Sequence, residues 1–318
     1  MHRRKIQLIA GSTYSVSLPK EWVKKNNLKE KKEIMISEKN DRTLIISPHS
    51  TEGKKLNEIS LDIDKYANNI DQVLFAVYYL GIETINIFSK KELTKEAKAR
   101  LKKTITHMSG TEISYEDRQK ITINVLLDKS KVNIIHVFYR ISLLIESSIV
   151  CLLEQTDINE ININENEIDR LYHLMAKMIS LSLIDSNILC SSKINNVSLI
   201  PMYFLVSKRL ENIGDNVYHL SKYMYKNKVA VEGEKETLCF IREKVNRSIR
   251  YLRRMHKSSE LFEKTNADNL ININNAVSNM PDRIVQNYLE DIVRYIVDIE
   301  DEIVNISFYN QLIGDDIL

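Results

Sequence analysis

Two segments in the second half of this 318-residue chain carry the same spacing of apolar residues. In the first, apolar side chains recur at steps of four, three, four, three and four residues, at Val206, Leu210, Ile213, Val217, Leu220 and Met224. In the second, the spacing returns 86 residues later, at Ile292, Ile296, Ile299, Ile303 and Ile306. Such steps place the side chains along one stripe of an α-helix that is buried in a bundle. The repeated register predicts a bundle formed by internal duplication.

An earlier helix in each half carries a stripe of the same kind. The first consists of Ile135, Phe138, Ser142, Ile145, Ile149 and Leu152, and the second of Leu238, Ile241, Val245, Ser248 and Leu252. The halves differ in their middle element, because 71 residues separate Ile135 from Val206 but only 54 separate Leu238 from Ile292, which is 17 fewer. We expect repeats at about 131–228 and 231–313, within a helical body at 131–318.

The middle helix of the first repeat is expected in "ENEIDRLYHLMAKMISLSLID", and the shorter "NADNLININNAVSNM" takes its place in the second repeat. Both regions contain an Asn/Ile-rich tract, which indicates compositional bias. We therefore expect loops at "DINEININENE" and at the corresponding tract of the second repeat.

The first 50 residues have a different pattern. Apolar and polar residues alternate on both sides of the "AGST" turn, with apolar positions at Ile6, Leu8, Tyr14, Val16 and Leu18. The alternation predicts two short strands, and Gly11 can adopt a positive φ between them. Pro19 then opens a short helix, "PKEWVKKNN", and "KKEIMISE" and "RTLIISP" predict a second pair of strands. This ββαββ unit is too small to bury its apolar residues alone, so we expect a second copy or another domain to cover them.

Charge is unevenly distributed along the chain. Residues 1–50 contain 11 Lys and Arg against 5 Asp and Glu, a balance of +6, while the whole chain has 45 against 43. The remainder therefore has 34 against 38, a balance of −4. A basic excess beside strands favours a nucleic-acid surface, because Lys and Arg release counterions from phosphate. The alternative is an ordinary solvated face.

The segment "GSTYSVSLPKEWV", followed by a leucine and a β-hairpin, resembles the SpoVT/AbrB-type swapped-hairpin domain. The resemblance implies that two copies of residues 1–50 interlock as a dimer, which binds DNA through basic residues on loops and N-terminal arms. The phosphate contacts that we expect are Arg3, Arg4, Lys5, Lys20, Lys24 and Lys25. Lys31-Lys32 stands where the family has Gly-Asp in the turn after the helix. The alternative is a domain that only dimerises the protein.

Residues 55–130 predict a small α/β module. Strands are expected in "KLNEISLDI", "ETINIFS" and "KITINVLL", and helices in "NNIDQVLFAVYYLG" and "TKEAKARLKKTITHMSG", which end at Gly81 and Gly110. The seven glycines of the chain form no GxGxxG or GxxxxGK pattern, so we expect no nucleotide. We interpret the module as a connector or a small sensing module.

The helix at 206–224 also carries polar residues opposite its apolar stripe. Glu211, Asp215 and His219 are spaced by four, so they lie on one outward helix face with Cβ atoms about 5–6 Å apart. Two carboxylates and an imidazole suit a metal such as iron, zinc or manganese. The alternative is a solvated acidic face.

"RLENIGDNVYHLSKYM" resembles the helix with the E-R-I-G-D motif of the PhoU family, and "NEIDRLYHLM" resembles the preceding helix of archaeal members with an AbrB-type N-terminus. The resemblance covers nearly the whole chain. It implies two three-helix repeats with surface ExxxD motifs, iron or zinc in some members, and restraint of phosphate uptake through the ATPase subunit of the phosphate ABC transporter. Glu211 and Asp215 match the acidic pair, while Asn212 and His219 replace the usual arginine and asparagine.

The motif is less complete in the second repeat. Asp301 and Asn305 stand at the positions of the aspartate and the histidine, but Val297 stands where the glutamate is expected. Asp298 and Glu302 are the candidate substitutes. We therefore expect the first repeat to hold the stronger metal site.

A basic stripe runs along "EKVNRSIRYLRRMHK", where Arg247, Arg250, Arg254 and Lys257 alternate by three and four residues. The spacing places these residues on the outer face of the fourth helix. Docking to an acidic transporter subunit is one interpretation, and a solvated face is the other.

Several sequence patterns are absent, and their absence narrows the possible functions. Cys151, Cys190 and Cys239 lie far apart without a CxxC pair, which disfavours a disulfide framework and favours a reducing cytoplasm. No signal-peptide core is evident, and the longest apolar run that we identify, around "VSLIPMYFLV", is far short of the ~20 residues that span a bilayer, so we expect no direct membrane insertion. ExxH and HExxH are absent and no activated nucleophile is evident, so we expect no enzyme.

Together these patterns predict an α+β, mainly α chain with a swapped-hairpin β domain at 1–50, a small α/β module at 55–130 and a duplicated three-helix bundle at 131–318. The favoured function is a dimeric, DNA-binding regulator of phosphate uptake with a PhoU-like sensing body. One alternative is a regulator that acts only by contact with the phosphate ABC transporter. A carboxylate metalloenzyme is the less favoured alternative.

Overall fold

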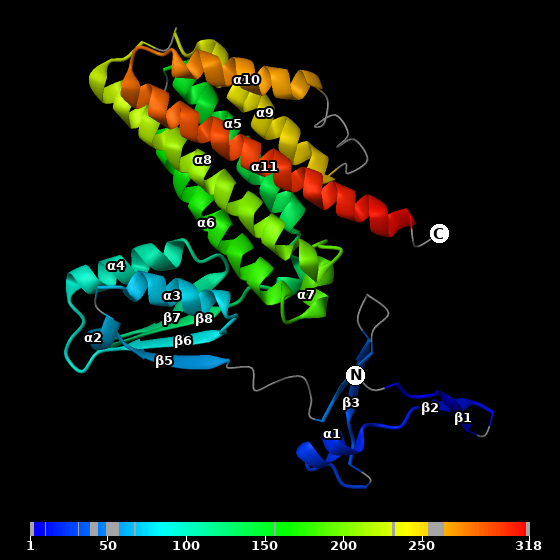
Figure 1. Ribbon diagram of the computed structural model, residues 1–318. Helices are drawn as coiled ribbons and strands as arrows, with labels where there is room; N and C mark the ends of the chain where they lie inside the picture. Colours follow the sequence, from blue (N-terminus) through cyan, green and yellow to red (C-terminus); the bar gives the residue numbers. More distant parts are fainter. Residues whose placement is uncertain are drawn as a thin grey trace. The chain divides into compact units, whose positions relative to one another are not determined.

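The computed structural model describes residues 3–9, 11–30, 32–38, 44–48, 57–66, 68–155, 157–230, 233–253 and 264–315. The chain folds into two compact units, residues 1–55 and residues 56–318 (Figure 1). Helices dominate, and short strands form two hairpins in the first unit and one sheet in the second. The α+β, mainly α prediction is therefore confirmed.

The N-terminal unit consists of two hairpins joined by a short helix. Its elements are β1 (Gln7–Ile9), β2 (Thr13–Ser15), α1 (Lys20–Lys25), β3 (Met35–Glu38) and β4 (Leu44–Ser47), and each strand pair is antiparallel. Gly11 has a φ of +72° between β1 and β2, which glycine adopts without steric cost. Pro19 precedes α1 and Asn26 follows it. The predicted order of elements is confirmed, and Lys31 of the Lys31-Lys32 pair lies outside the described residues.

The apolar side chains of this unit are open to solvent. Ile6, Tyr14 and Leu44 are 71%, 74% and 63% exposed. None of the described side chains between residues 3 and 48 is buried. Exposed apolar surface on this scale marks an interaction surface, which agrees with the expectation that another chain or domain covers it.

The second unit begins with a four-stranded sheet in the order β5-β6-β8-β7. Its elements are β5 (Glu58–Asp62), α2 (Ile63–Tyr66), α3 (Ile70–Tyr79), β6 (Thr84–Phe88), α4 (Lys95–Thr106), β7 (Thr111–Glu116) and β8 (Lys120–Val125). β5 is parallel to β6, and the other pairs are antiparallel. Helices α3 and α4 cover one face of the sheet (Figure 1). The sequence pattern does not predict β7, because its alternating residues are mostly exposed at the edge of the sheet.

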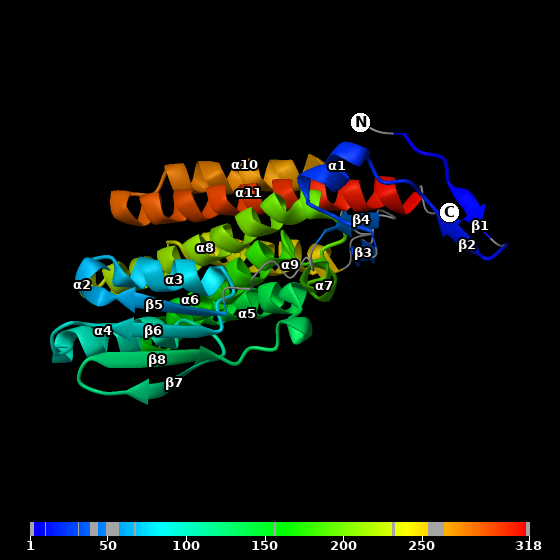
Figure 2. The same cartoon turned by 90° about the horizontal axis from the view of Figure 1, so that it is seen from below.

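The bundle contains two sets of three long helices. They are α5 (Ile134–Leu153), α6 (Ile158–Ser182) and α8 (Ile200–Asn227) in the first half, and α9 (Lys235–Arg253), α10 (Lys264–Ser278) and α11 (Arg283–Asp315) in the second. A short segment, Lys129–Lys131, precedes α5, and α7 (Ser186–Ser191) and Val197–Leu199 lie between α6 and α8. Equivalent helices pack together, α8 along α11 and α5 along α9 (Figures 1 and 2). With 15 residues, α10 is shorter than the 25-residue α6. The shorter stretch between the two apolar stripes of the second repeat predicts this difference.

All four apolar stripes that the sequence predicts are buried in one continuous core. The expectation of loops in the Asn/Ile-rich tracts is wrong, because both tracts are helical in α6 and α10. Ile161 and Ile168 are buried seven residues apart on one face of α6. Asn164 lies between them and donates from Nδ2 to the Ser148 hydroxyl at 3.2 Å. The isoleucine spacing therefore outweighs the loop tendency of asparagine.

Helix α5 has the length and apolar composition of a membrane span, with 20 residues and a mean hydropathy of 1.6 over its most apolar window. The expectation that no segment approaches such a span is therefore wrong. Yet α5 packs against α6, α8 and α9, and Phe138, Ile141 and Ile145 have no exposed surface. Its position as a core helix of the bundle accounts for its composition.

Helix α3 packs against α6 and so joins the α/β module to the bundle within the second unit. The His173 ring stacks on Phe75 with centroids 3.6 Å apart, and the Tyr79 hydroxyl bonds to His173 Nδ1. Lys177 is wholly buried on the same helix, and its Nζ lies 3.9 Å from the centre of the Tyr78 ring. No described residue makes a hydrogen bond to that Nζ. Burial lowers the pKa of Lys177 to about 7.

We expect Lys177→Met to stabilise the second unit, most strongly near pH 6. The wild-type folded chain releases the Lys177 proton near pH 7, whereas the unfolded chain holds it to about pH 10.4. Wild-type stability should therefore rise between these values, and the variant should lose that rise. The gain near pH 6 should be on the order of 2 kcal/mol. Denaturant titrations at several pH values measure it, and an equal gain at pH 6 and pH 10 would contradict the assignment.

Candidate metal centre

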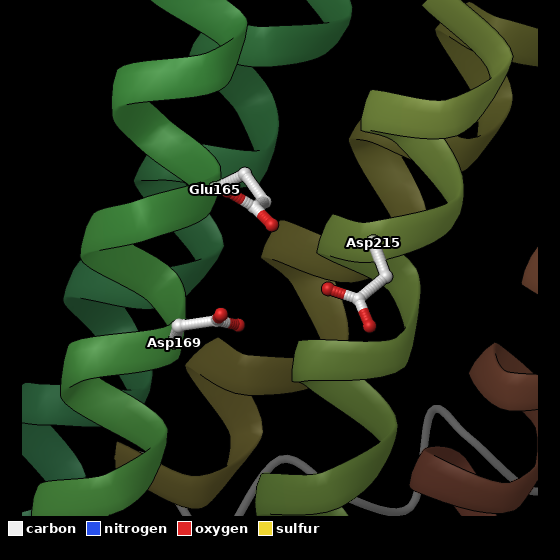
Figure 3. Close-up of side chains that lie close together, drawn as sticks. All are labelled: Glu165, Asp169 and Asp215. Atoms are coloured by element: carbon white, nitrogen blue, oxygen red, sulfur yellow. The ribbon is translucent and has the colours of Figure 1, made fainter. Parts of the chain in front are cut away.

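Three carboxylates meet where α6 packs against α8. Glu165 and Asp169 lie on α6, and Asp215 lies on α8. One oxygen from each side chain lies within 4.8 Å of the others. Figure 3 shows the three side chains pointing toward one another across the gap between the two helices. We call these residues the carboxylate cluster.

Helix geometry and one glycine explain the convergence. Glu165 and Asp169 are four residues apart, so they project from the same face of α6. Gly214 lies beside Asp215 on α8, and a Cβ at that position would come 3.0 Å from Ile168 Cδ1. The missing side chain lets α8 approach α6 closely, which brings Asp215 toward the two carboxylates of α6.

The carboxylate cluster concentrates negative charge in a partly buried place. Burial, with the neighbouring charges of Asp215, Glu165 and Glu211 adding to it, raises the pKa of Asp169 to about 7. Burial also raises the pKa values of Glu165 and Asp215, although lysine charges oppose the shifts, that of Lys208 at Asp215 and that of Lys222 at Glu165. A cation among these oxygens would remove the repulsion that opposes their ionisation.

Glu211 does not lie on an outward face, so that part of the sequence prediction is wrong. It is 9% exposed, and Lys208 Nζ donates to its two oxygens at 2.7 and 2.5 Å. The same ammonium group lies 5.0 Å from the centre of the Tyr172 ring. Burial raises the pKa of Glu211, and the bond from Lys208 opposes this shift. Lys208 therefore already supplies Glu211 with a counter-ion.

His219 also lies apart from the cluster. It is exposed on α8, and its ring stacks at 6.5 Å from that of Tyr288 on α11. Of the three predicted ligands, Asp215 alone joins the cluster, and its partners come from α6. Glu165 and Asp169 are also four residues apart, in "ENEID". A spacing within one helix, however, does not reveal which other helix packs against it.

The predicted second site does not converge into one cluster. Asp298 pairs with Arg209 of α8 at 2.7 Å. Asp301 is exposed, and Glu302 accepts a long bond of 3.4 Å from Asn305. Partial shielding from water raises the pKa of Asp301, and the charges of Asp298 and Glu300 add to this rise. Among the described residues, the structure thus brings three carboxylates together in the first repeat but not in the second.

The predicted basic residues divide into two groups. All six in the N-terminal unit are exposed, namely Arg3, Arg4, Lys5, Lys20, Lys24 and Lys25. On α9, Arg250 is exposed, whereas Arg247 is half-buried and its Nε donates to the Tyr251 hydroxyl at 3.1 Å. Arg254 and Lys257 lie outside the described residues. The outer-face assignment therefore does not fit Arg247.

We expect Gly214→Val to separate α6 from α8 and weaken cation binding at the carboxylate cluster. The branched side chain would collide with Ile168 and cost about 1–3 kcal/mol of stability. Tyr225→Val, at a position 72% exposed on the same helix, is the matched control. Melting curves with and without Mn²⁺ measure both effects. An unchanged response to Mn²⁺ in Gly214→Val would show that close packing at Gly214 is unimportant.

Comparison with known proteins identifies part of the chain. Residues 7–54 match the model of a family described as antidote-toxin recognition MazE, bacterial antitoxin. No curated protein and no solved structure matches the chain. The match spans the two hairpins and α1, which are the elements that the AbrB-type resemblance predicts. The N-terminal unit is therefore a MazE/AbrB-like domain.

Proposed function

We propose that the chain is a homodimeric transcriptional regulator that binds promoter DNA through its N-terminal unit. MazE/AbrB-like domains typically dimerise and bind DNA. The observation that carries the proposal is the combination of six exposed basic residues with uncovered apolar strands in one small unit. A second copy would cover the strands, and the basic residues would contact phosphate.

We propose further that the regulated process is phosphate uptake. The sequence resemblance of "RLENIGDNVYHLSKYM" to the PhoU family supports this assignment, together with the three-helix order repeated in α5-α6-α8 and α9-α10-α11. In this account the chain acts in the cytoplasm and catalyses no reaction. The ATPase subunit of the phosphate ABC transporter is a second proposed partner of the helical body.

The carboxylate cluster is the proposed metal site of that body. Glu165, Asp169 and Asp215 offer three oxygen ligands. The set fits a divalent cation such as Mn²⁺, because carboxylate donors suit Mn²⁺, whereas zinc prefers nitrogen and sulfur donors in structural sites. The pKa of Asp169, near 7, also supports a metal site, because a bound cation would favour the charged form of this carboxyl group.

Salt dependence tests the DNA-binding proposal. Replacing Arg3, Arg4 and Lys5 by alanine should flatten the slope of log K against log salt by roughly two to three, because each phosphate contact contributes about −0.9. Trp22 is the only tryptophan of the chain and lies in α1, so its fluorescence can follow duplex binding. Alanine at Lys90, Lys91 and Lys95, which are exposed in the second unit, is the control. Absence of any duplex binding by the wild type would favour the transporter-only alternative.

A further inference from the structure

The α/β module and the bundle have separate hydrophobic cores, although both belong to the second unit. The buried apolar residues from Leu61 to Val125 pack in one cluster, and those from Ile134 to Ile306 pack in another. Helix α3 of the module packs against α6 of the bundle, and we call this packing the α3–α6 contact. A part that has its own core keeps its fold when a contact with its neighbour opens.

Three polar side chains of α6 face the module. Arg170, His173 and Lys177 are spaced by three and four residues, so they lie on one face of the helix. Arg170 Nη1 donates to Ser109 Oγ at 2.7 Å. His173 stacks on the Phe75 ring, and Lys177 lies over a tyrosine ring of α3. Each contact thus pairs a side chain that can carry a positive charge with an uncharged partner in the module.

Lys177 has the least favourable surroundings for a positive charge. Its Nζ is buried over the Tyr78 ring, and no described residue makes a hydrogen bond to it. Burial lowers the pKa of Lys177, Lys129 lowers it further, and Glu83 opposes the shift. Lys129 and Glu83 pair with each other at 3.4 Å. A proton on Lys177 would therefore create a buried cation without a counter-ion, which opposes the α3–α6 contact.

His173 is the second group in this contact that a proton would disturb. Its ring lies against Phe75 and bonds to the Tyr79 hydroxyl on α3, and the ring centre of His107, which follows α4, is 6.4 Å away. Burial lowers the pKa of His173 to about 4, and the positive charges of His107 and of Lys208 on α8 add to this shift. A charged His173 would therefore also oppose the contact.

We propose that the α/β module is a proton-sensing element of the bundle, which separates from α6 when Lys177 and His173 gain protons, while both parts stay folded. The released side chains reach water, where lysine holds its proton to about pH 10.4 and histidine to about pH 6.5. Docking should therefore strengthen as pH rises from about 4 to 6.5 through His173, and again from about 7 to 10.4 through Lys177. This inference uses no residue of the N-terminal unit or of the carboxylate cluster, so it stands independently of the proposed function.

Methyl NMR of the full-length chain can follow the contact and the two cores separately. Leu181 of α6 reports the contact, because a Cβ at Gly81, just after α3, would lie 2.8 Å from its Cδ2. Ile123 reports the core of the module, and Ile145 that of the bundle. Between pH 9 and pH 8 the ratio of released to docked chains should rise about tenfold, and it should rise again below pH 6.5. Unchanged Leu181 signals from pH 9 to pH 5, or loss of all three signals together, would overturn the proposal.

Two variants assign the two steps. Lys177→Met should remove the change of the Leu181 signals between pH 9 and pH 8, because methionine fills a similar space and takes no proton. His173→Phe should remove the change below pH 6.5 and keep a ring against Phe75. Lys90→Met and His136→Phe remove exposed groups of the same two kinds and should behave like the wild type. A wild-type response in both Lys177→Met and His173→Phe would refute the assignment.

Discussion

Removal of residues 1–55 should convert the proposed dimer into a monomer that no longer binds duplex DNA. The physical reason is the division of apolar surface between the two units. The second unit has its own buried core, whereas the described part of the first unit has no buried side chain. The remaining chain, residues 56–318, should therefore stay folded without its N-terminal unit.

Light scattering and circular dichroism measure this outcome together. The truncated chain should have the mass of one copy and retain the helical signal of the bundle. The full-length variant with alanine at Arg3, Arg4 and Lys5 is the matched control, because it should remain a dimer while its DNA binding weakens. A truncated chain that stays fully dimeric would place the dimer interface in the second unit instead.

The second large effect concerns the carboxylate cluster. We expect the double variant Asp169→Asn and Asp215→Asn to be more stable than the wild type without metal, by on the order of 1 kcal/mol near pH 8. In the wild type, Asp169 keeps its proton up to about pH 7 when folded but loses it near pH 4 when unfolded. Wild-type stability should therefore fall as pH rises between these values, and the variant should lose most of that fall.

Added Mn²⁺ should make the wild type more stable than the double variant. Mn²⁺ at about 100 times its dissociation constant should stabilise the wild type by about 2.7 kcal/mol and leave the double variant unchanged. Asp268→Asn removes an exposed carboxylate from α10 and is the control. Melting curves at pH 5 and pH 8, with and without Mn²⁺, measure both effects. Equal stabilisation of wild type and double variant would mean that the cluster does not bind the cation.

The bundle could be predicted because the spacing of its apolar residues lies within single helices and occurs twice in the sequence. Val206 to Met224 and Ile292 to Ile306 share one register, and burial of such a stripe needs no knowledge of its partner. By contrast, β7 is an edge strand whose Ile113 is half-buried and whose other residues are largely exposed, so it lacks a hydrophobic signature. The composition of the Asn/Ile tracts predicts loops, but the tracts are helical, and the seven-residue spacing of the buried Ile161 and Ile168 is the pattern that fits a helix.

The candidate site could be predicted only in part. The pattern of its own helix predicts Asp215, but its two carboxylate partners come from α6, and a contact between helices is a tertiary property. The same pattern predicts an outward-facing Glu211, yet Glu211 is buried and bonded to Lys208, three residues earlier. The glycine before Asp215 is a local signal of close helix packing.

The most direct test of the central claim is the occupancy of DNA by the native protein inside its own cells. Chromatin immunoprecipitation of the untruncated chain should recover the promoters of phosphate-uptake genes, and the recovery should change between phosphate-rich and phosphate-starved cells. Alanine at Arg3, Arg4 and Lys5 should remove most of that recovery. Recovery of no promoter in either condition, with the protein present at normal levels, would contradict its assignment as a DNA-binding regulator.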